Sequence, residues 1–179
     1  MSSIIKVNTY QDANGNALFS SDGSGTVTLD SNFSGVLPSN TPLFKVRLAN
    51  AQTISNVTRT VIAFDQVEID TGSNWDNTNK RYIPDEAGYY FFYTQVRLAD
   101  STDFTDFGLR LRKNGNASSD YVESNVSNWH YESNWCQGIW YMNGTTDYVD
   151  VTAYHNKGSN SEINAPWYTW IQGFKLIGA

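Results

Sequence analysis

The stretch Gly88-Tyr-Tyr-Phe-Phe-Tyr-Thr-Gln-Val-Arg-Leu98 decides the fold of this chain of 179 residues. In an extended strand, successive side chains point to opposite faces of the sheet. One face of this strand consists of Tyr90, Phe92, Val96 and Leu98, and the opposite face consists of Tyr89, Phe91 and Tyr93. A strand in a sandwich of two sheets needs only one apolar face. Something else must therefore cover the second.

Two arrangements would cover this second face. In the first, the strand lies in the middle of three layers. In the second, Tyr89, Phe91 and Tyr93 line an interface between subunits, where aromatic residues are enriched. Aromatic residues make up 15% of the sequence, and one domain with one core does not obviously cover the second face. We therefore favour the subunit interface.

The rest of the sequence also predicts β-structure. Asn-Gly pairs favour hairpin turns because both residues tolerate positive φ; they occur at Asn14-Gly15, Asn114-Gly115 and Asn143-Gly144. Apolar residues that alternate with polar ones near the last two pairs are Phe107, Leu109 and Leu111, and Val149, Val151 and Ala153. Further β-branched and aromatic runs cover residues 61–69 and 167–177. No window of helical length keeps an apolar stripe, so we expect an all-β protein.

Composition excludes several classes of function. The chain has 12 basic and 18 acidic residues and a net charge of -6, without the clustered Lys and Arg that bind nucleic acid. It has no run of about 18 apolar residues that could insert into a membrane. The single cysteine, Cys136, excludes an intramolecular disulfide and a multi-cysteine zinc site. Residues 1–8 lack the apolar core of a signal peptide, so we expect no conventional export.

The region before residue 42 differs from the rest. Runs at residues 4–10, 17–20 and 26–29 predict three short strands separated by loops of Asp, Asn and Gly. Burying its few apolar side chains would contribute about 2 kcal/mol each, whereas ordering the backbone costs about 1–2 kcal/mol per residue. We therefore expect this arm, residues 1–41, to need another chain. Its candidate anchoring residues are Ile4, Ile5, Val7, Leu18, Phe19, Val27 and Leu29.

From about Pro42 onward, the order of motifs resembles the globular head of the C1q family, which is related to tumour necrosis factor. The motifs are Ile62-Ala-Phe-Asp-Gln-Val67, Lys80-Arg-Tyr-Ile-Pro-Asp-Glu-Ala-Gly-Tyr-Tyr-Phe-Phe92, Leu109-Arg-Leu-Arg-Lys-Asn-Gly115, Asp147-Tyr-Val-Asp-Val151 and Ile171-Gln-Gly-Phe-Lys-Leu176. The resemblance implies a ten-stranded jelly-roll sandwich over residues 42–179 that forms a homotrimer, with one sheet packed around a threefold axis. The implied interface consists of Tyr89, Phe91 and Tyr93, with Tyr154 and Trp170 as further members.

The sequence departs from the C1q family before the head. No collagen-like stalk is present and the usual cysteine framework is missing, so the extracellular animal roles of that family are not expected. Residues 2–16 and 20–28 instead resemble a leader of virion proteins of tailed bacteriophages, where it is joined to variable heads, C1q-like ones included. This second resemblance implies that the arm anchors the chain to a virus particle.

Catalytic and metal-binding patterns are missing from the sequence. The histidines His130 and His155 are not in a metal-ligand spacing, and no phosphate-binding loop or Gly-x-Ser-x-Gly turn occurs. Calcium takes several oxygen ligands, and acidic clusters are found at Asp100, Asp103 and Asp106, and at Glu123 and Glu132. None matches a calcium motif, so we favour solvated acidic loops over the alternative of a calcium site, which the C1q resemblance implies. We expect no other cofactor and no enzymatic activity.

Two aromatic stretches fit the recognition of sugars, namely 75–79 and 128–135. Flat aromatic rings cover the apolar faces of sugars, while amide and carboxylate groups bond to hydroxyls. The candidate ligand-binding residues are Trp75, Asn77, Trp129, His130 and Tyr131. The alternative is that these aromatic rings are buried in the core or at subunit contacts.

Together these patterns predict a trimeric virion structural protein of a bacteriophage, assembled in the host cytoplasm. Its arm would bind other virion proteins of the tail, portal or capsid, and its head would be a fibre tip that contacts glycans of the host surface. One alternative is a decoration protein that stabilises the capsid. A second alternative is a non-viral carbohydrate-binding or carbohydrate-active module.

Overall fold

The computed structural model describes residues 9–29, 41–99, 106–116, 121–126 and 133–177. The chain divides into two compact units, Met1–Ser39 and Asn40–Ala179, which we call the arm and the head. The described residues form strands and turns without a helix, as the sequence predicts. Accordingly, these residues contain no helix with the length and apolar character needed to cross a membrane.

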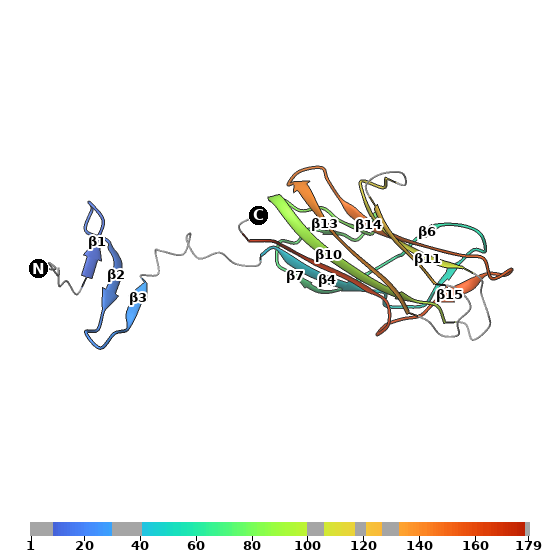
Figure 1. Ribbon diagram of the computed structural model, residues 1–179, viewed down its shortest axis with the longest axis horizontal. Helices are drawn as coiled ribbons and strands as arrows, with labels where there is room; N and C mark the ends of the chain where they lie inside the picture. The colour runs from blue at the N-terminus through green and yellow to red at the C-terminus, as the bar shows by residue number, and fades with distance from the viewer. Residues whose placement is uncertain (1–8, 30–40, 100–105, 117–120, 127–132, 178–179) are drawn as a thin grey trace, which may run out of the picture. The chain divides into compact units, whose positions relative to one another are not determined.

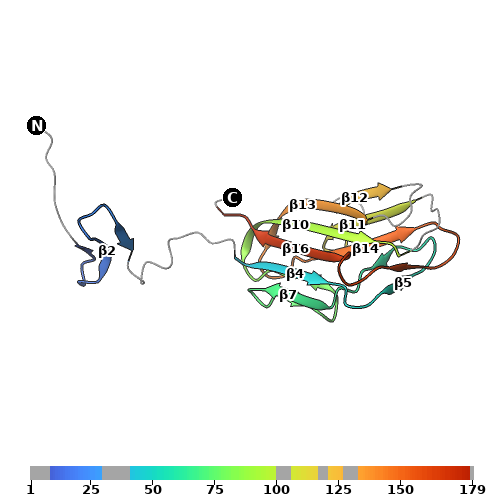
Figure 2. The same cartoon turned by 90° about the horizontal axis from the view of Figure 1, so that it is seen from below.

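One large sheet of the head has five antiparallel strands, which Figure 2 shows side by side. In spatial order they are β13 (Ser133–Asn143), β10 (Ala87–Arg97), β16 (Trp170–Lys175), β4 (Leu43–Arg47) and β7 (Gln66–Asp70). The decisive aromatic stretch is therefore an inner strand, β10, which pairs with β13 on one side and with β16 on the other.

The second large sheet packs against the first (Figure 1). Its order is β12 (Tyr121–Val126), β11 (Phe107–Lys113), β14 (Val149–His155), β9 (Arg81–Tyr82) and β8 (Trp75–Asp76), with β6 (Thr60–Val61) also paired to β14. A small separate sheet joins β5 (Gln52–Ile54) to β15 (Ser161–Ile163). Several strands have only two or three residues, and the predicted count of ten strands stays a prediction.

The core lies between the two large sheets. Fully buried side chains include Tyr90, Phe92 and Val96 of β10, Leu109 and Leu111 of β11, and Val149, Val151 and Ala153 of β14. The predicted alternation is confirmed in β11, whereas in β14 the intervening Asp150 and Thr152 are buried too. Phe44 of β4 stacks on Tyr82 of β9, with ring centroids 3.8 Å apart and planes 9° apart. This stack joins one sheet to the other through the middle of the core.

The run at residues 61–69 is not the single strand that its composition favours. It is divided between the end of β6 and β7, and residues 62–65 are outside both strands. Ile62 and Phe64 have no exposed surface, so the segment between the strands still fills the core. The physical reason for the break is that β6 belongs to the second sheet and β7 to the first.

Asn134 is a buried polar side chain that links the two large sheets. The Nδ2 group of Asn134 in β13 donates to the carbonyl oxygens of Phe107, at 3.0 Å, and Ser124, at 2.8 Å. The amide therefore ties an edge strand of the first sheet to β11 and β12 of the second.

Cys136 is buried as a free thiol, and burial raises its pKa to about 12. The thiol is therefore protonated and inert at neutral pH.

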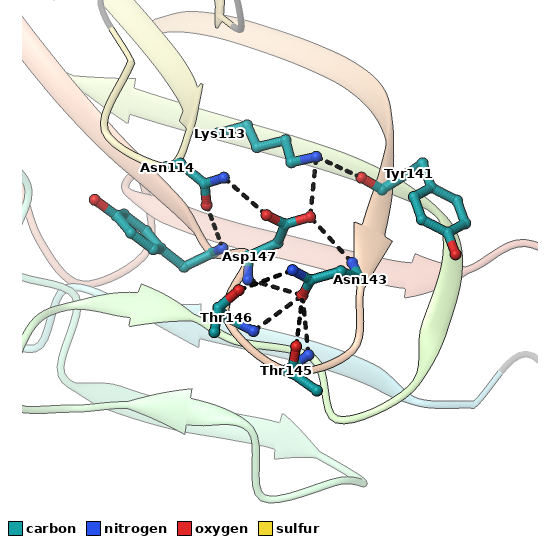
Figure 3. Close-up of polar contacts among 8 residues, drawn as sticks. Lys113, Asn114, Tyr141, Asn143, Thr145, Thr146 and Asp147 are labelled. Atoms are coloured by element: carbon teal, nitrogen blue, oxygen red, sulfur yellow. Dashed lines mark hydrogen bonds and ion pairs between the residues drawn. The ribbon is translucent and has the colours of Figure 1, made fainter.

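The chain turns at both Asn114-Gly115 and Asn143-Gly144, and one polar network joins the two turns (Figure 3). The first turn lies between the paired strands β11 and β12, as predicted. The second leads from β13 to β14 in the other sheet, so the hairpin predicted there is wrong. Asn114 and Gly115 both have positive φ, at 54° and 67°. Asn143 Oδ1 accepts hydrogen bonds from the backbone N–H groups of residues 145–147, at 2.9–3.0 Å. The carboxylate of Asp147 in turn accepts from the backbone of Asn143, at 3.0 Å, and from the side chain of Asn114, at 2.8 Å, and lies 3.0 Å from Lys113 Nζ.

This network favours the charged form of Asp147. Burial opposes the charge, but hydrogen bonds from Asn114, Lys113 and the backbone of Asn143 outweigh it and lower the pKa of Asp147 below its ordinary value.

The arm forms a three-stranded sheet of β1 (Thr9–Gln11), β2 (Ala17–Ser21) and β3 (Val27–Leu29). The strands predicted at residues 17–20 and 26–29 are confirmed within a residue. The first predicted strand, residues 4–10, overlaps β1 at Thr9 and Tyr10, and its residues Ile4, Ile5 and Val7 lie outside the described residues. Tyr10 stacks on Phe19 with ring centroids 4.3 Å apart. No side chain described in residues 9–28 is buried, so this sheet has no core of its own.

We expect Phe44→Ala to destabilise the head by about 3–5 kcal/mol, because it removes a fully buried ring and leaves a cavity beside Tyr82. Urea denaturation at fixed protein concentration measures the loss. The matched control is Val61→Ala on β6, a partly exposed position, where we expect a loss below about 1 kcal/mol. Equal losses at the two positions would contradict the core as described.

We expect Asp147→Asn to destabilise the head by about 1–3 kcal/mol at neutral pH, because it removes a charged acceptor. A carboxylate whose pKa is lowered by folding contributes stability above its unfolded pKa of about 3.9, and this contribution is lost as pH falls through the folded pKa. The variant should therefore lose less stability than the wild type between pH 5 and pH 2 in urea titrations. Glu162→Gln, at an exposed position, is the control. Identical acid sensitivity of wild type and Asp147→Asn would refute this role.

Candidate interaction surface on the five-stranded sheet

Strand β10 separates its side chains as the sequence predicts. Tyr90, Phe92 and Val96 face the core and have no exposed surface. Tyr89, Phe91 and Tyr93 lie on the opposite side of the sheet, where Tyr89 is 44% exposed. No third layer covers this side in the head's described residues, because the two large sheets enclose a single core.

The neighbouring strands extend this outer surface. On β13, Trp135, Ile139 and Tyr141 are each more than half exposed. On β16, the outward positions alternate with the buried Ile171 and Gly173. We define the ring-rich face as Tyr89, Phe91, Tyr93, Trp135, Ile139, Tyr141, Trp170 and Phe174.

The rings of this face contact one another across the strands. Antiparallel pairing places outward residues of β10 opposite outward residues of β13 and β16. Ring centroids are 5.5 Å apart for Tyr89 and Tyr141, 5.6 Å for Phe91 and Phe174, 5.1 Å for Tyr93 and Trp170, and 6.3 Å for Tyr93 and Trp135. Such cross-strand aromatic pairs stabilise a sheet. The rings are therefore fixed in place before any partner binds.

A hollow of about 240 Å³ lies on the other half of the same surface. It is formed mainly by Leu43, Lys45, Ile69, Gln172 and Phe174, from strands β4, β7 and β16. The outer surface of the five-stranded sheet therefore has the ring-rich face at its β13 side and a concave region toward β7.

Charged groups border the ring-rich face. The carboxylate of Glu68 binds both Lys45, at 3.0 Å, and Arg47. Arg47 also lies over the ring of Trp167, at 4.4 Å from its centroid, and Arg97 lies 4.2 Å from the ring centroid of Tyr168. These cations are thus already engaged by a carboxylate or by aromatic rings, and the surface between them is mainly apolar.

This arrangement is suited to binding another protein surface. Its members are aromatic and aliphatic side chains. Soluble monomers rarely expose apolar patches larger than a few hundred Å², and Tyr, Trp and Phe are enriched where protein surfaces meet.

The further members predicted for the subunit interface lie on different sheets. Trp170 belongs to the ring-rich face through its contact with Tyr93. Tyr154 does not: it is on β14 of the second sheet, below the guanidinium of Arg59. The prediction that Tyr154 shares a surface with Tyr89 is therefore wrong. Alternation gives the face on which a side chain lies, but it does not say which sheet the strand joins.

Trp75 is not available to a ligand, contrary to the sequence-based expectation. It is only 9% exposed and is part of the hydrophobic core. Its ring lies 6.1 Å from that of Phe44 and 6.3 Å from that of Phe64. Asn77 is exposed in the following turn and accepts a hydrogen bond from Lys80 Nζ at 3.0 Å. The remaining candidates, Trp129, His130 and Tyr131, lie outside the described residues.

The described part of the chain has no group of three or more His, Cys, Asp and Glu side chains that could hold a metal ion. Among the acidic residues considered for calcium, Asp100, Asp103 and Glu132 are outside that part. Glu123 is instead paired with Arg59 and Arg110.

Sequence reasoning missed Trp135, Ile139, Tyr141 and Phe174 as members of the ring-rich face. A signal was present in residues 135–142, which carry apolar residues in both alternating positions, as β10 does. Reading that run in the same way as Gly88–Leu98 would have identified β13 as a second strand with two apolar faces.

Comparison with known proteins shows similarity in structure but not in sequence. No protein-family model and no curated protein matches the chain. Murine APRIL at pH 5.0 is similar with a TM-score of 0.58 and 16% identity, covering 75% of this chain and 98% of that chain. Eiger TNF from S. frugiperda is similar with a TM-score of 0.50 and 14% identity, covering 76% and 93%. The globular domain of zebrafish complement 1qA has a TM-score of 0.49 and 16% identity, covering 75% and 97%. At these identities the likeness to APRIL and Eiger concerns the fold alone: the head is an all-β jelly roll of the TNF-like type.

Proposed function

We propose that this protein is a homotrimeric structural component of a bacteriophage virion, joined through the ring-rich face of its head and anchored by its arm. The observation that carries the proposal is the ring-rich face itself, an ordered aromatic surface on the outer side of a sheet. The C1q-like motifs imply a trimer with one sheet around the threefold axis, and the ring-rich face is on the sheet that contains β10.

The size and shape of this surface support self-association. A specific interface buries roughly 800 Å² on each partner, and large aromatic side chains bury about 150–250 Å² each. A closed ring of copies needs two different patches that fit each other. The exposed Trp135 and Ile139 at the β13 edge, and the hollow beside Leu43 and Ile69, are two such patches on one sheet.

The arm supports the part of the proposal that concerns assembly. Its described side chains are exposed or half-buried, so hydrophobic burial within one chain stabilises it little. Leu18 and Phe19 are half-buried on β2, and Val27 on β3 is 60% exposed. These apolar groups would gain stability by contact with sister arms or with another virion protein. The leader-like sequence of residues 2–16 and 20–28 favours a virion as the setting.

In this setting the head would face outward as a fibre tip, without enzymatic activity, and would contact glycans of the host surface. Decoration of the capsid is the competing role. The partner of the arm distinguishes the two: cross-linking of the arm to a tail or portal protein supports the fibre tip, and cross-linking to the major capsid protein supports decoration.

We expect Tyr89→Asp to convert the trimer to monomers at micromolar concentration. It would place charges in an apolar interface, where an uncompensated charge costs about 3–5 kcal/mol. Sedimentation velocity measures the change, from a mass three times the 20.1 kDa of one chain to that of the single chain.

The matched control is Val57→Asp, which introduces the same charge at a 60% exposed position away from this sheet. Asp also tolerates the positive φ of 56° at that position better than Val does. A wild-type head that sediments as a monomer, or a Tyr89→Asp head that stays trimeric, would overturn the interface.

Deletion of residues 1–40 should leave a folded, trimeric head that no longer enters particles, because the head is a separate compact unit with its own core. Circular dichroism and sedimentation test the first part, and complementation of a particle lacking this protein tests the second. Incorporation of the truncated head at the level of the full chain would show that the arm is not the anchor.

A further inference from the structure

A polar cavity of about 500 Å³ lies on the second sheet, away from the ring-rich face. It is lined by residues of β11, β12 and β14, by the segment before β6 and by the residue before β11. The lining residues are Val57, Arg59, Asp106, Arg110, Glu123, Asn125 and Tyr154. We call this cavity the arginine pocket. Its volume is enough for about one or two sugar rings, within the range of small-molecule sites.

One carboxylate serves two guanidinium groups in the arginine pocket. Glu123 Oε1 accepts a hydrogen bond from Arg59 Nη2 at 2.5 Å and lies 2.9 Å from Nε of Arg110. Arg59 Nη1 is buried and has no hydrogen-bond partner among the described residues, whereas Nε of Arg110 is engaged by Glu123. A buried donor without a partner is costly, so Arg59 keeps a donor that a bound acceptor could satisfy.

The surroundings of Arg59 disfavour its charged form. Burial lowers the pKa of Arg59, Glu123 opposes this effect, and the neighbouring Arg110 adds to it. A further anion near Arg59 would therefore stabilise the charged guanidinium.

The space beside these cations depends on the glycine at position 108 of β11. A Cβ atom at Gly108 would lie 2.6 Å from Asn125 Oδ1, 3.2 Å from Arg59 Nη2 and 3.3 Å from Glu123 Oε1. Glycine weakens a strand interior, and it often marks a point where another group approaches closely. Gly108 lets the amide, the guanidinium and the carboxylate converge on one point.

The other lining groups determine the kind of anion that fits. Asp106 and Glu123 would repel a doubly charged phosphate, but their oxygens accept hydrogen bonds from hydroxyl groups. Asn125 adds a donor and an acceptor, and the ring of Tyr154 lies below Arg59 with its centroid 5.6 Å from the guanidinium carbon. The combination fits a ligand with one negative charge, several hydroxyls and an apolar ring face.

We propose that the arginine pocket binds the carboxylate of an acidic sugar, such as a uronic acid residue of a polysaccharide. Arg59 and Arg110 bind the carboxylate, while Asn125 and Asp106 bind ring hydroxyls. This inference rests on the proposed contact with host glycans and names its site and ligand class. The pocket and the ring-rich face are on different sheets, so a trimer leaves the pocket open.

Titration calorimetry of the full chain with trigalacturonic acid tests the proposal. The methyl ester of the same trisaccharide is the matched neutral ligand, and sodium acetate is the control for simple anion binding. We expect the ester and the Arg59→Gln variant each to weaken binding by about 10- to 100-fold, as for loss of charge-assisted hydrogen bonds. Asn125→Ala, at an exposed position, should weaken binding while the thermal midpoint is unchanged, which keeps the test valid if Arg59→Gln unfolds.

Arg81→Gln is the matched control variant, because Arg81 is on the same sheet and pairs with Asp76 outside the pocket; it should bind like the wild type. Equal binding of acid and ester, equal binding by wild type and Asn125→Ala, or binding of acetate as tight as the trisaccharide would each overturn the proposal. Sedimentation of the same samples separates the two claims. A trimer without affinity for the acid overturns the pocket alone, and a monomer that binds it supports the pocket and overturns the trimer.

Discussion

The pairing of β10 with strands on both sides is the constraint on which the rest of the head depends. Its inward rings build the core with β11 and β14, and the same backbone pairing fixes its outward rings against those of β13 and β16. The outer surface therefore cannot adjust its rings without disturbing the core. For a surface that is to bind another copy, this rigidity is favourable, because little conformational entropy is left to lose on association.

Much of the fold could be predicted from periodicity. Alternation in β10, β11 and β14 correctly assigned their inward residues, and the Asn-Gly pairs located turns. What periodicity cannot supply is the sheet to which a strand belongs, and this is why Tyr154 was assigned to the wrong surface. A strand of two residues, such as β8, is too short to show alternation. The burial of Trp75 against Phe44 and Phe64 could therefore not be predicted, because the surrounding sequence is rich in Asn and Asp.

The candidate surfaces were predictable to different degrees. The ring-rich face could be predicted in part. Alternation within β10 places Tyr89, Phe91 and Tyr93 on one side of the strand, whereas the contribution of β13 depends on which strands are neighbours. The arginine pocket could not be inferred from sequence. Arg59, Glu123 and Tyr154 are far apart along the chain. They are brought to one place by the antiparallel pairing of β11 with β12 and β14 and of β14 with β6, which follows Arg59.

The lack of any buried side chain in residues 9–28 of the arm has a consequence for attachment. In the proposed assembly, such a segment would become fully ordered only on contact with another protein, so a single arm would bind its partner weakly. The proposed trimer would join three arms through its heads, and the second and third arms would bind at a high effective concentration once the first has docked. Retention on the particle would then depend steeply on trimerisation, because single chains would dissociate from it faster than trimers.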